Sequence, residues 1–171
     1  MDGVGIDFGT SNSLAAIHAA AGETRLVSLE PDTPVMPTAT YLDRDFHTRT
    51  GQAAIDRYIE DNRGRTVELV PEVVGEASLL VGEAPAGSRA GPETAAQKVY
   101  GPALEDHGLP GRLFRGIKRL LGDPGTRRLM VFGKPYRLVA LTTPVLLRMR
   151  QQIEAERRAL GLPAPIGALR L

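Results

Sequence analysis

The chain has 171 residues, of which 42% are hydrophobic and 24% are charged, a composition that excludes wholesale disorder. With 21 Lys and Arg against 20 Asp and Glu, the net charge of +1 creates no overall field that would attract nucleic acid or an anionic membrane. The absence of cysteine excludes disulfides and thiolate metal sites. No apolar run approaches the ~20 residues that span a bilayer, and no signal-peptide pattern is present, so we expect a cytoplasmic protein.

The first strands are predicted from the alternation of apolar residues with small or polar ones. This alternation gives strands at 4–8, 14–19 and 25–29, separated by short breaks. Because sequential strands with short connections pair with their neighbours, we expect an antiparallel meander. β-Branched and aromatic residues predict a further strand at 38–42.

The middle of the chain is predicted to be less regular. Apolar residues at helical spacing predict a helix at 52–62, whereas the Gly- and Pro-rich stretch 63–91 has no clear period and is typical of irregular strands and loops. A short amphipathic helix is predicted at 112–121, with Gly122 as its stop. Its basic face consists of Arg112, Arg115, Lys118 and Arg119.

The strongest helical pattern covers 141–160. We expect Pro144 at its first position, Thr142 or Thr143 as its N-cap, and Gly161 just beyond its end. The apolar stripe consists of Leu141, Val145, Met149, Ile153 and Leu160. The charged side chains expected to face solvent are Glu154, Glu156, Arg157 and Arg158. A final strand is predicted at 166–171.

The segment between the first two predicted strands concentrates polar groups in one turn. Gly9 allows a sharp turn and close backbone approach to a ligand, and the N–H groups of Thr10, Ser11 and Asn12 can converge on phosphate oxygens. Asp7, at the end of a buried strand, can hold a hydrated Mg²⁺ ion that bridges those oxygens. The loop by itself is equally compatible with a plain hairpin turn.

Residues 5–13 resemble the first phosphate motif of Hsp70 chaperones, within the superfamily of actin, sugar kinases and Hsp70 ATPases. The resemblance continues in the same order along the chain, with a poor match at 63–109. The other matching segments are 36–42, 50–54, 113–122, 141–160 and 168–171. Together they resemble lobe I of the Hsp70 nucleotide-binding domain.

This resemblance implies an α/β, ribonuclease H-like fold, that of actin/Hsp70 ATPase lobe I, whose mixed sheet begins with the antiparallel meander. We expect a core subdomain formed by 1–45 and 135–171, with an α+β subdomain inserted at 46–134. The strand at 166–171 is expected to lie parallel to the first strand. The resemblance also implies that the chain is incomplete at its carboxyl end and that a second lobe is missing.

The implied function is ATP binding in an Hsp70-like chaperone ATPase, with ATP or ADP and Mg²⁺ as cofactors. Gly9, Thr10, Ser11 and Asn12 would bind phosphate, and Asp7 would hold Mg²⁺ through water. The Thr10 hydroxyl would face the γ-phosphate or the attacking water, which makes Thr10 and Asp7 the catalytic candidates. The implied partners are nucleotide, unfolded protein clients and the second lobe.

The sequence departs from the family at Ile55, which matches the position of a lysine that reaches the γ-phosphate. An apolar side chain cannot stabilise charge on a transferring phosphoryl group, so we expect a divergent, bacterial-type branch that retains nucleotide binding better than hydrolysis. Two alternatives stay open: a phosphotransferase similar to sugar or acetate kinases, and a non-hydrolysing actin-like scaffold.

Other possible sites are weaker. The basic face at 112–121 is more typical of a solvated helix than of a nucleic-acid interface, given the balanced charge. Asp7-Phe8-Gly9 also spells the metal-binding tripeptide of protein kinases, but no His-Arg-Asp catalytic loop precedes it. The three histidines lack metal-ligand spacing. We therefore expect neither a nucleic-acid partner nor a membrane partner.

Overall fold

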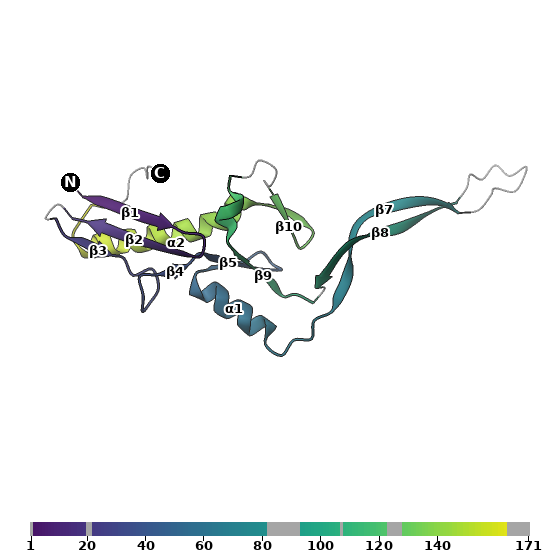
Figure 1. Cartoon of the computed structure of the whole chain (residues 1–171), viewed down its shortest axis with the longest axis horizontal. Coiled ribbons are helices and arrows are strands. Elements are labelled where there is room, and N and C mark those ends of the chain that lie inside the picture. Colours follow the sequence, from purple (N-terminus) through teal and green to yellow (C-terminus); the bar gives the residue numbers. More distant parts are fainter. Residues whose placement is uncertain (1, 20–21, 82–92, 107, 123–127, 164–171) are drawn as a thin grey trace, which may run out of the picture. The chain divides into compact units, whose positions relative to one another are not determined.

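The computed structural model describes residues 2–19, 22–81, 93–106, 108–122 and 128–163, with the backbone alone at 71–81 and 93–105 (Figure 1). This part of the chain is a mixed α/β structure with antiparallel sheets and two α-helices. It divides into two compact units, 64–109 and the remainder. The predicted insertion at 46–134 is broader than the smaller unit, and that division into subdomains stays a prediction. In the described residues, no helix is long and apolar enough to cross a membrane.

The amino-terminal sheet contains the predicted meander. Its strands are β1 (Gly3–Phe8), β2 (Asn12–His18) and β3 (Thr24–Leu26), with the short β4 (Met36–Pro37) also paired with β2. All three pairings are antiparallel, as expected for the meander. The predicted parallel partner of β1, at 166–171, lies outside the described residues.

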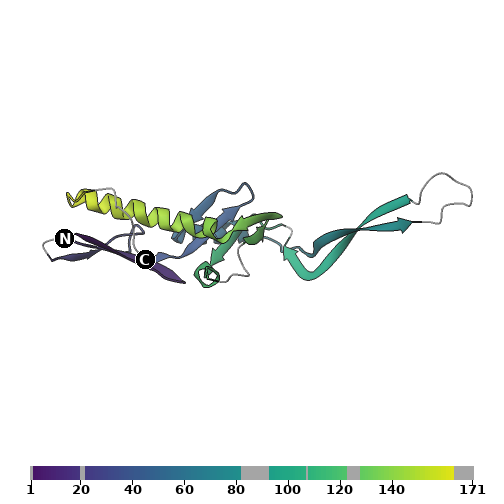
Figure 2. The same ribbon diagram turned by 90° about the horizontal axis from the view of Figure 1, so that it is seen from above.

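One face of this sheet is buried against helix α2 (Leu138–Ala159), which runs along it (Figures 1 and 2). Paired residues of β1 and β2 share a face, so Val4, Ile6 and Phe8 lie with the buried side of β2. The core cluster consists of Ala15, Ile17, Val27, Leu29, Met36, Val145, Met149 and Ile153. Asp7 lies on the opposite face, which is exposed.

Helix α2 begins three residues earlier than predicted. Pro144 lies inside the helix rather than at its first position. Thr142 and Thr143 are not N-caps, because their hydroxyls donate to the carbonyl of Val139 at 3.1 and 2.8 Å within the helix. The N-cap residue is Arg137, which provides no side-chain cap.

The carboxyl end of α2 follows the prediction for Gly161 but not for Arg157. Gly161 has a φ of 69°, its N–H donates to Arg158, and the N–H of Leu162 donates to Arg157, which is a Schellman motif. Arg157 is buried rather than facing solvent, and its guanidinium donates twice to the carbonyl of Pro163. Its i+4 spacing from Ile153 extends the buried stripe, whereas Leu160, which was expected in that stripe, is exposed.

The second sheet has the order β6 (Thr48–Thr50), β5 (Ala39–Asp43) and β9 (Gly111–Arg115), with both pairs antiparallel. Helix α1 (Gln52–Asn62) follows β6 and confirms the helix predicted at 52–62. Its apolar side packs on β5 and β9 in a small cluster around the buried Tyr41.

The helix predicted at 112–121 is wrong. Its first half is strand β9, and only Ile117–Leu120 is helical, as the single 3₁₀ turn η1. Backbone pairing with β5 satisfies the strand, and Gly116, with a φ of 69°, separates the two halves. The apolar spacing that suggested one helix arises because Leu113 packs on one cluster while Phe114 and Ile117 pack on another.

Two further hairpins complete the described chain. Strands β10 (Arg128–Val131) and β11 (Lys134–Arg137) pair antiparallel before α2. In the smaller unit, β7 (Leu69–Val81) and β8 (Glu93–Asp106) form one long antiparallel pair. The prediction of irregular strands and loops at 63–91 is confirmed in part. Residues 63–68 form no helix or strand, and β7 pairs with β8 with register shifts between Pro71 and Gly75. Residues 82–91 lie outside the described residues.

The tips of two hairpins are joined by aromatic rings. Phe46, between β5 and β6, stacks on Tyr136 with ring centroids 6.0 Å apart, and it meets Phe132 edge-on at 6.3 Å. Phe46 and Phe132 have φ values of 64° and 50°, which bulky residues rarely adopt. The ring contacts provide the tertiary stabilisation that such backbone conformations require.

Candidate functional site

The turn between β1 and β2 contains Gly9, at a position where only glycine fits. β1 ends at Phe8 and β2 begins at Asn12, so residues 9–11 connect the two strands. A Cβ atom built on Gly9 would collide with the carbonyl oxygen of Asn12. The sequence predicted close approach of the Gly9 backbone to a ligand, which stays a prediction; the group that lies against Gly9 in the structure is the carbonyl of its own turn.

The groups expected to bind phosphate lie at this turn. Ser11 and Asn12 are exposed and Thr10 is half-buried. Within the described residues, the backbone N–H groups of Thr10 and Ser11 donate to no protein acceptor. Unpaired N–H groups on an exposed turn are available to an anionic ligand.

Asp7 is exposed near the end of β1, opposite the buried face of the sheet. In the described part of the chain, its carboxylate accepts no hydrogen bond and forms no ion pair. A carboxylate that the fold does not use is available to a hydrated cation. The structure thus places Asp7, Gly9, Thr10, Ser11 and Asn12 on one short hairpin, as the sequence predicted.

The turn is supported by the segment that follows β4. The N–H of Thr38 donates to the carbonyl of Ser11 at 2.9 Å. Below it, the buried hydroxyls of Ser13 and Thr38 lie 2.7 Å apart in a hydrogen bond. Neither hydroxyl was singled out from the sequence, because Ser and Thr in strands are common and only the tertiary pairing of β2 with β4 brings them together.

Two residues of the η1 region also reach the turn. Lys118 Nζ donates to the carbonyl oxygen of Phe8 at 2.6 Å. A Cβ atom built on Gly116 would lie 3.9 Å from Thr10 Cγ2. The sequence assigned Lys118 to a solvated basic face and gave no signal for this contact, since the two partners are 110 positions apart.

A buried ion pair lies beside the turn. Glu30 and Arg148 are joined at 2.6 Å, and Glu30 Oε1 accepts the N–H of Gln52 at 2.8 Å, which caps the start of α1. Asn12 lines the same surface hollow as Glu30 and Gln52. Because the carboxylate is already paired with Arg148 and the helix amide, we assign it a structural role.

Ile55 is partly buried and packs against the cluster of Ala39, Tyr41 and Ala54. Its side chain is therefore part of the packing between α1 and the second sheet. The position that the resemblance to Hsp70 chaperones equates with a lysine therefore contributes to the core.

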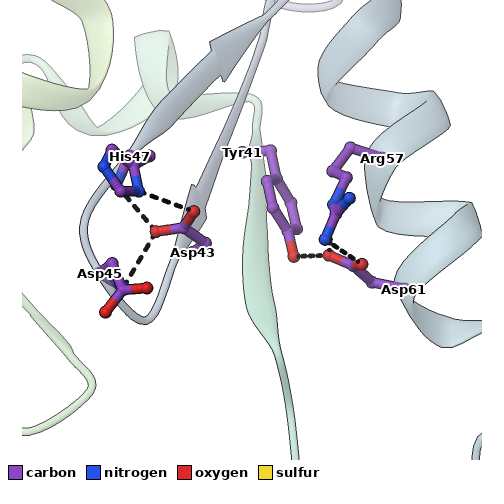
Figure 3. A network of polar contacts seen from close by, with 6 residues as sticks. All are labelled: Tyr41, Asp43, Asp45, His47, Arg57 and Asp61. Atoms are coloured by element: carbon purple, nitrogen blue, oxygen red, sulfur yellow. Dashed lines mark hydrogen bonds and ion pairs between the residues drawn. The ribbon is translucent and has the colours of Figure 1, made fainter.

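Tyr41 forms a second polar network with α1, drawn in Figure 3. Its hydroxyl donates to Asp61, which also accepts Arg57 Nε at 3.0 Å and pairs with a second guanidinium nitrogen at 2.8 Å. Burial and the Asp61 carboxylate raise the pKa of Tyr41 to about 12, and Asp61 also raises the pKa of Arg57. Gly111 leaves room for the Tyr41 ring, because a Cβ there would collide with it.

Asp43, Asp45 and His47 gather at the turn between β5 and β6 (Figure 3). Asp43 Oδ1 accepts the N–H groups of Asp45 at 3.0 Å and His47 at 2.8 Å, and His47 Nδ1 lies 3.3 Å from Asp43 Oδ2. These bonds are those of a turn stabilised by its first residue, and they provide no evidence for a metal.

Comparison with known proteins adds no assignment. No protein-family model matches the chain, and no curated protein matches it significantly. The function must therefore be argued from the geometry of the site.

Proposed function

We propose that this chain is the phosphate-binding part of an ATP-binding protein of the Hsp70/actin-like superfamily, with a ribonuclease H-like lobe I fold. The observation that carries the proposal is the β1–β2 turn, where a carboxylate and two backbone N–H groups stay unused by the described protein. Exposed N–H groups and a carboxylate without protein partners are open to a ligand as well as to water, and their gathering in one turn supports a ligand site.

The residues present fit a magnesium nucleotide. The N–H groups of Thr10 and Ser11 would bind phosphate oxygens, and the Thr10 hydroxyl and Asn12 amide supply further polar groups at the same turn. Asp7 would hold Mg²⁺ through its water ligands, and the ion would neutralise phosphate charge. The adenine and ribose contacts are expected from a second lobe, and unfolded protein clients follow from the chaperone relationship alone.

A non-hydrolysing nucleotide-binding scaffold is the second candidate, and Ile55 favours it. Its side chain packs into the cluster around Tyr41 and supplies no charge to a phosphate. Binding requires the turn amides and Asp7, whereas phosphoryl transfer also requires groups that stabilise the transferring phosphate. Binding and turnover should therefore be measured separately.

The test is calorimetric titration of the full chain with ATP, with and without Mg²⁺. Asp7→Ala should weaken Mg²⁺-dependent binding by about tenfold, equivalent to one lost charge-assisted contact, and should not weaken Mg²⁺-free binding, because without the ion the carboxylate only repels the phosphates. Asp45→Ala is the matched control, because Asp45 is an exposed carboxylate at another hairpin turn. Equal affinity of wild type and Asp7→Ala in both conditions would exclude the assigned role of Asp7.

A further inference from the structure

Lys118 brings a positive charge to the β1–β2 turn from a distant part of the chain. Its Nζ donates to the carbonyl of Phe8, the residue between Asp7 and Gly9, at 2.6 Å. The side chain is exposed. A cation thus lies at the backbone of the turn where Asp7 and the unused N–H groups are found.

The position of Lys118 is fixed by its neighbours in η1. Ile117 is buried and packs in one cluster with Leu138 and Leu141 of α2. Gly116, the residue before η1, lies near the turn, because a Cβ atom built on it would be 3.9 Å from the Thr10 methyl carbon. Since Ile117 anchors η1 in this cluster, the lysine side chain starts from a backbone that packing holds beside the turn.

The ammonium of Lys118 retains capacity for a ligand. It has three N–H donors, and the bond to Phe8 uses one of them. Among the described residues, no carboxylate forms an ion pair with it. A carbonyl acceptor leaves the positive charge without a counter-ion, which a bound anion would provide.

We propose that Lys118 is a phosphate-binding residue, whose ammonium contacts the polyphosphate of a nucleotide held by the β1–β2 turn. The inference rests on the proposed function and specifies its ligand as a polyphosphate, since a nucleoside without phosphates would gain nothing from this charge. It also identifies a cation at the turn, where Ile55 supplies none.

The test compares Lys118→Met and Lys118→Arg in the full chain, titrated with MgATP, with inorganic tripolyphosphate and with adenosine. Lys118→Met should weaken binding of both polyphosphates by about tenfold or more, whereas Lys118→Arg should stay within about threefold of wild type. The salt dependence of MgATP affinity should become shallower in Lys118→Met, because one charge contact is lost. Arg119→Met is the matched control, since Arg119 is exposed on the same turn.

The outcomes separate this inference from the function on which it rests. If Lys118→Met binds MgATP as wild type does while Asp7→Ala is weakened, the lysine only ties the turn and the inference is overturned alone. A loss of melting temperature in Lys118→Met with an unchanged salt dependence would overturn it in the same way. If the wild type binds neither polyphosphate, the proposed function and the inference both fail.

Discussion

The β1–β2 turn and the β5–β6 turn each follow a strand with a carboxylate near its end, and they use that carboxylate in opposite ways. Asp43 accepts two N–H groups of its own turn, from Asp45 and His47. Asp7 accepts no hydrogen bond within the described residues, and its turn is instead tied to Thr38 by a backbone bond. The β5–β6 turn is stabilised by its own Asp43 side chain, whereas the β1–β2 turn is stabilised by Thr38 from another segment.

This difference indicates where a ligand can bind. An Asp side chain that accepts the N–H groups of its own turn is oriented by them and has fewer lone pairs left for another partner. A turn that other elements hold in place can leave its carboxylate and N–H groups free, and a fixed backbone with free polar groups is what a binding site requires. Variants that alter each turn test whether the contrast reflects function.

The largest effect is expected from Gly9→Ala, which disrupts the β1–β2 turn. The new Cβ would collide with the Asn12 carbonyl oxygen, so the turn backbone must shift. We expect a loss of about 2–3 kcal/mol in the free energy of unfolding, measured by urea denaturation, and loss of MgATP binding. Gly5→Ala is the control on the same strand, because no atom lies within 4 Å of its added Cβ. Equal stability of the two variants would contradict the model of the turn.

A smaller effect is expected from Tyr41→Phe, which alters the strand leading into the β5–β6 turn. Losing the bond to Asp61 should cost about 1.5 kcal/mol, while Asp61 keeps its pair with Arg57. The raised pKa adds a pH signature. Folding raises the pKa of Tyr41 from its ordinary value of 10.0 to about 12.

The sign of that signature follows from proton linkage. The stabilisation is complete below pH 10 and is lost as pH rises through the folded pKa of about 12, because the unfolded chain releases its proton first. The stability difference between wild type and Tyr41→Phe should therefore shrink between these two pH values. A constant difference across that range would show that Tyr41 titrates normally.

The sequence predicted those elements whose side chains follow one period. The meander, helix α1 and the buried stripe of α2 belong to this class, because each packs a single face against one core. The helix predicted at 112–121 is wrong because the apolar residues of this segment pack in two clusters and its first half pairs with β5. Local spacing cannot reveal which distant strand satisfies a backbone.

The candidate site likewise contains residues that the sequence predicted and residues that it did not. Asp7 and residues 9–12 are near neighbours in the sequence, so their joint presence at one turn could be predicted from it. Thr38 and Lys118 reach that turn from 25 or more positions beyond it, through strand pairing and the packing of η1. Their contribution depends on tertiary structure, and nothing in the residue pattern distinguished Lys118 from its neighbour Arg119.

Asp43→Ala should have a moderate effect on stability, confined to the β5–β6 turn. It removes the hydrogen bonds that the Asp43 carboxylate accepts from the N–H groups of Asp45 and His47. Because Asp45 and His47 are exposed, water can take the place of the carboxylate. We expect a loss of about 1 kcal/mol in the free energy of unfolding and unchanged MgATP affinity in calorimetry. Weakened nucleotide binding in this variant would show that the two turns are not functionally distinct.

The smallest effect on stability is expected from Asp7→Ala in the absence of ligand. The carboxylate is exposed, no described residue pairs with it, and its removal leaves the packing of Phe8 and Ile6 on the core intact. The free energy of unfolding should therefore change by no more than about 0.5 kcal/mol, as measured by urea denaturation beside Asp43→Ala. Adding MgATP should then separate Asp7→Ala from wild type, because only a chain that binds the ligand gains stability from it. A clear loss of stability without ligand would mean that Asp7, like Asp43, serves its own turn, and the contrast between the two hairpins would no longer support a binding site.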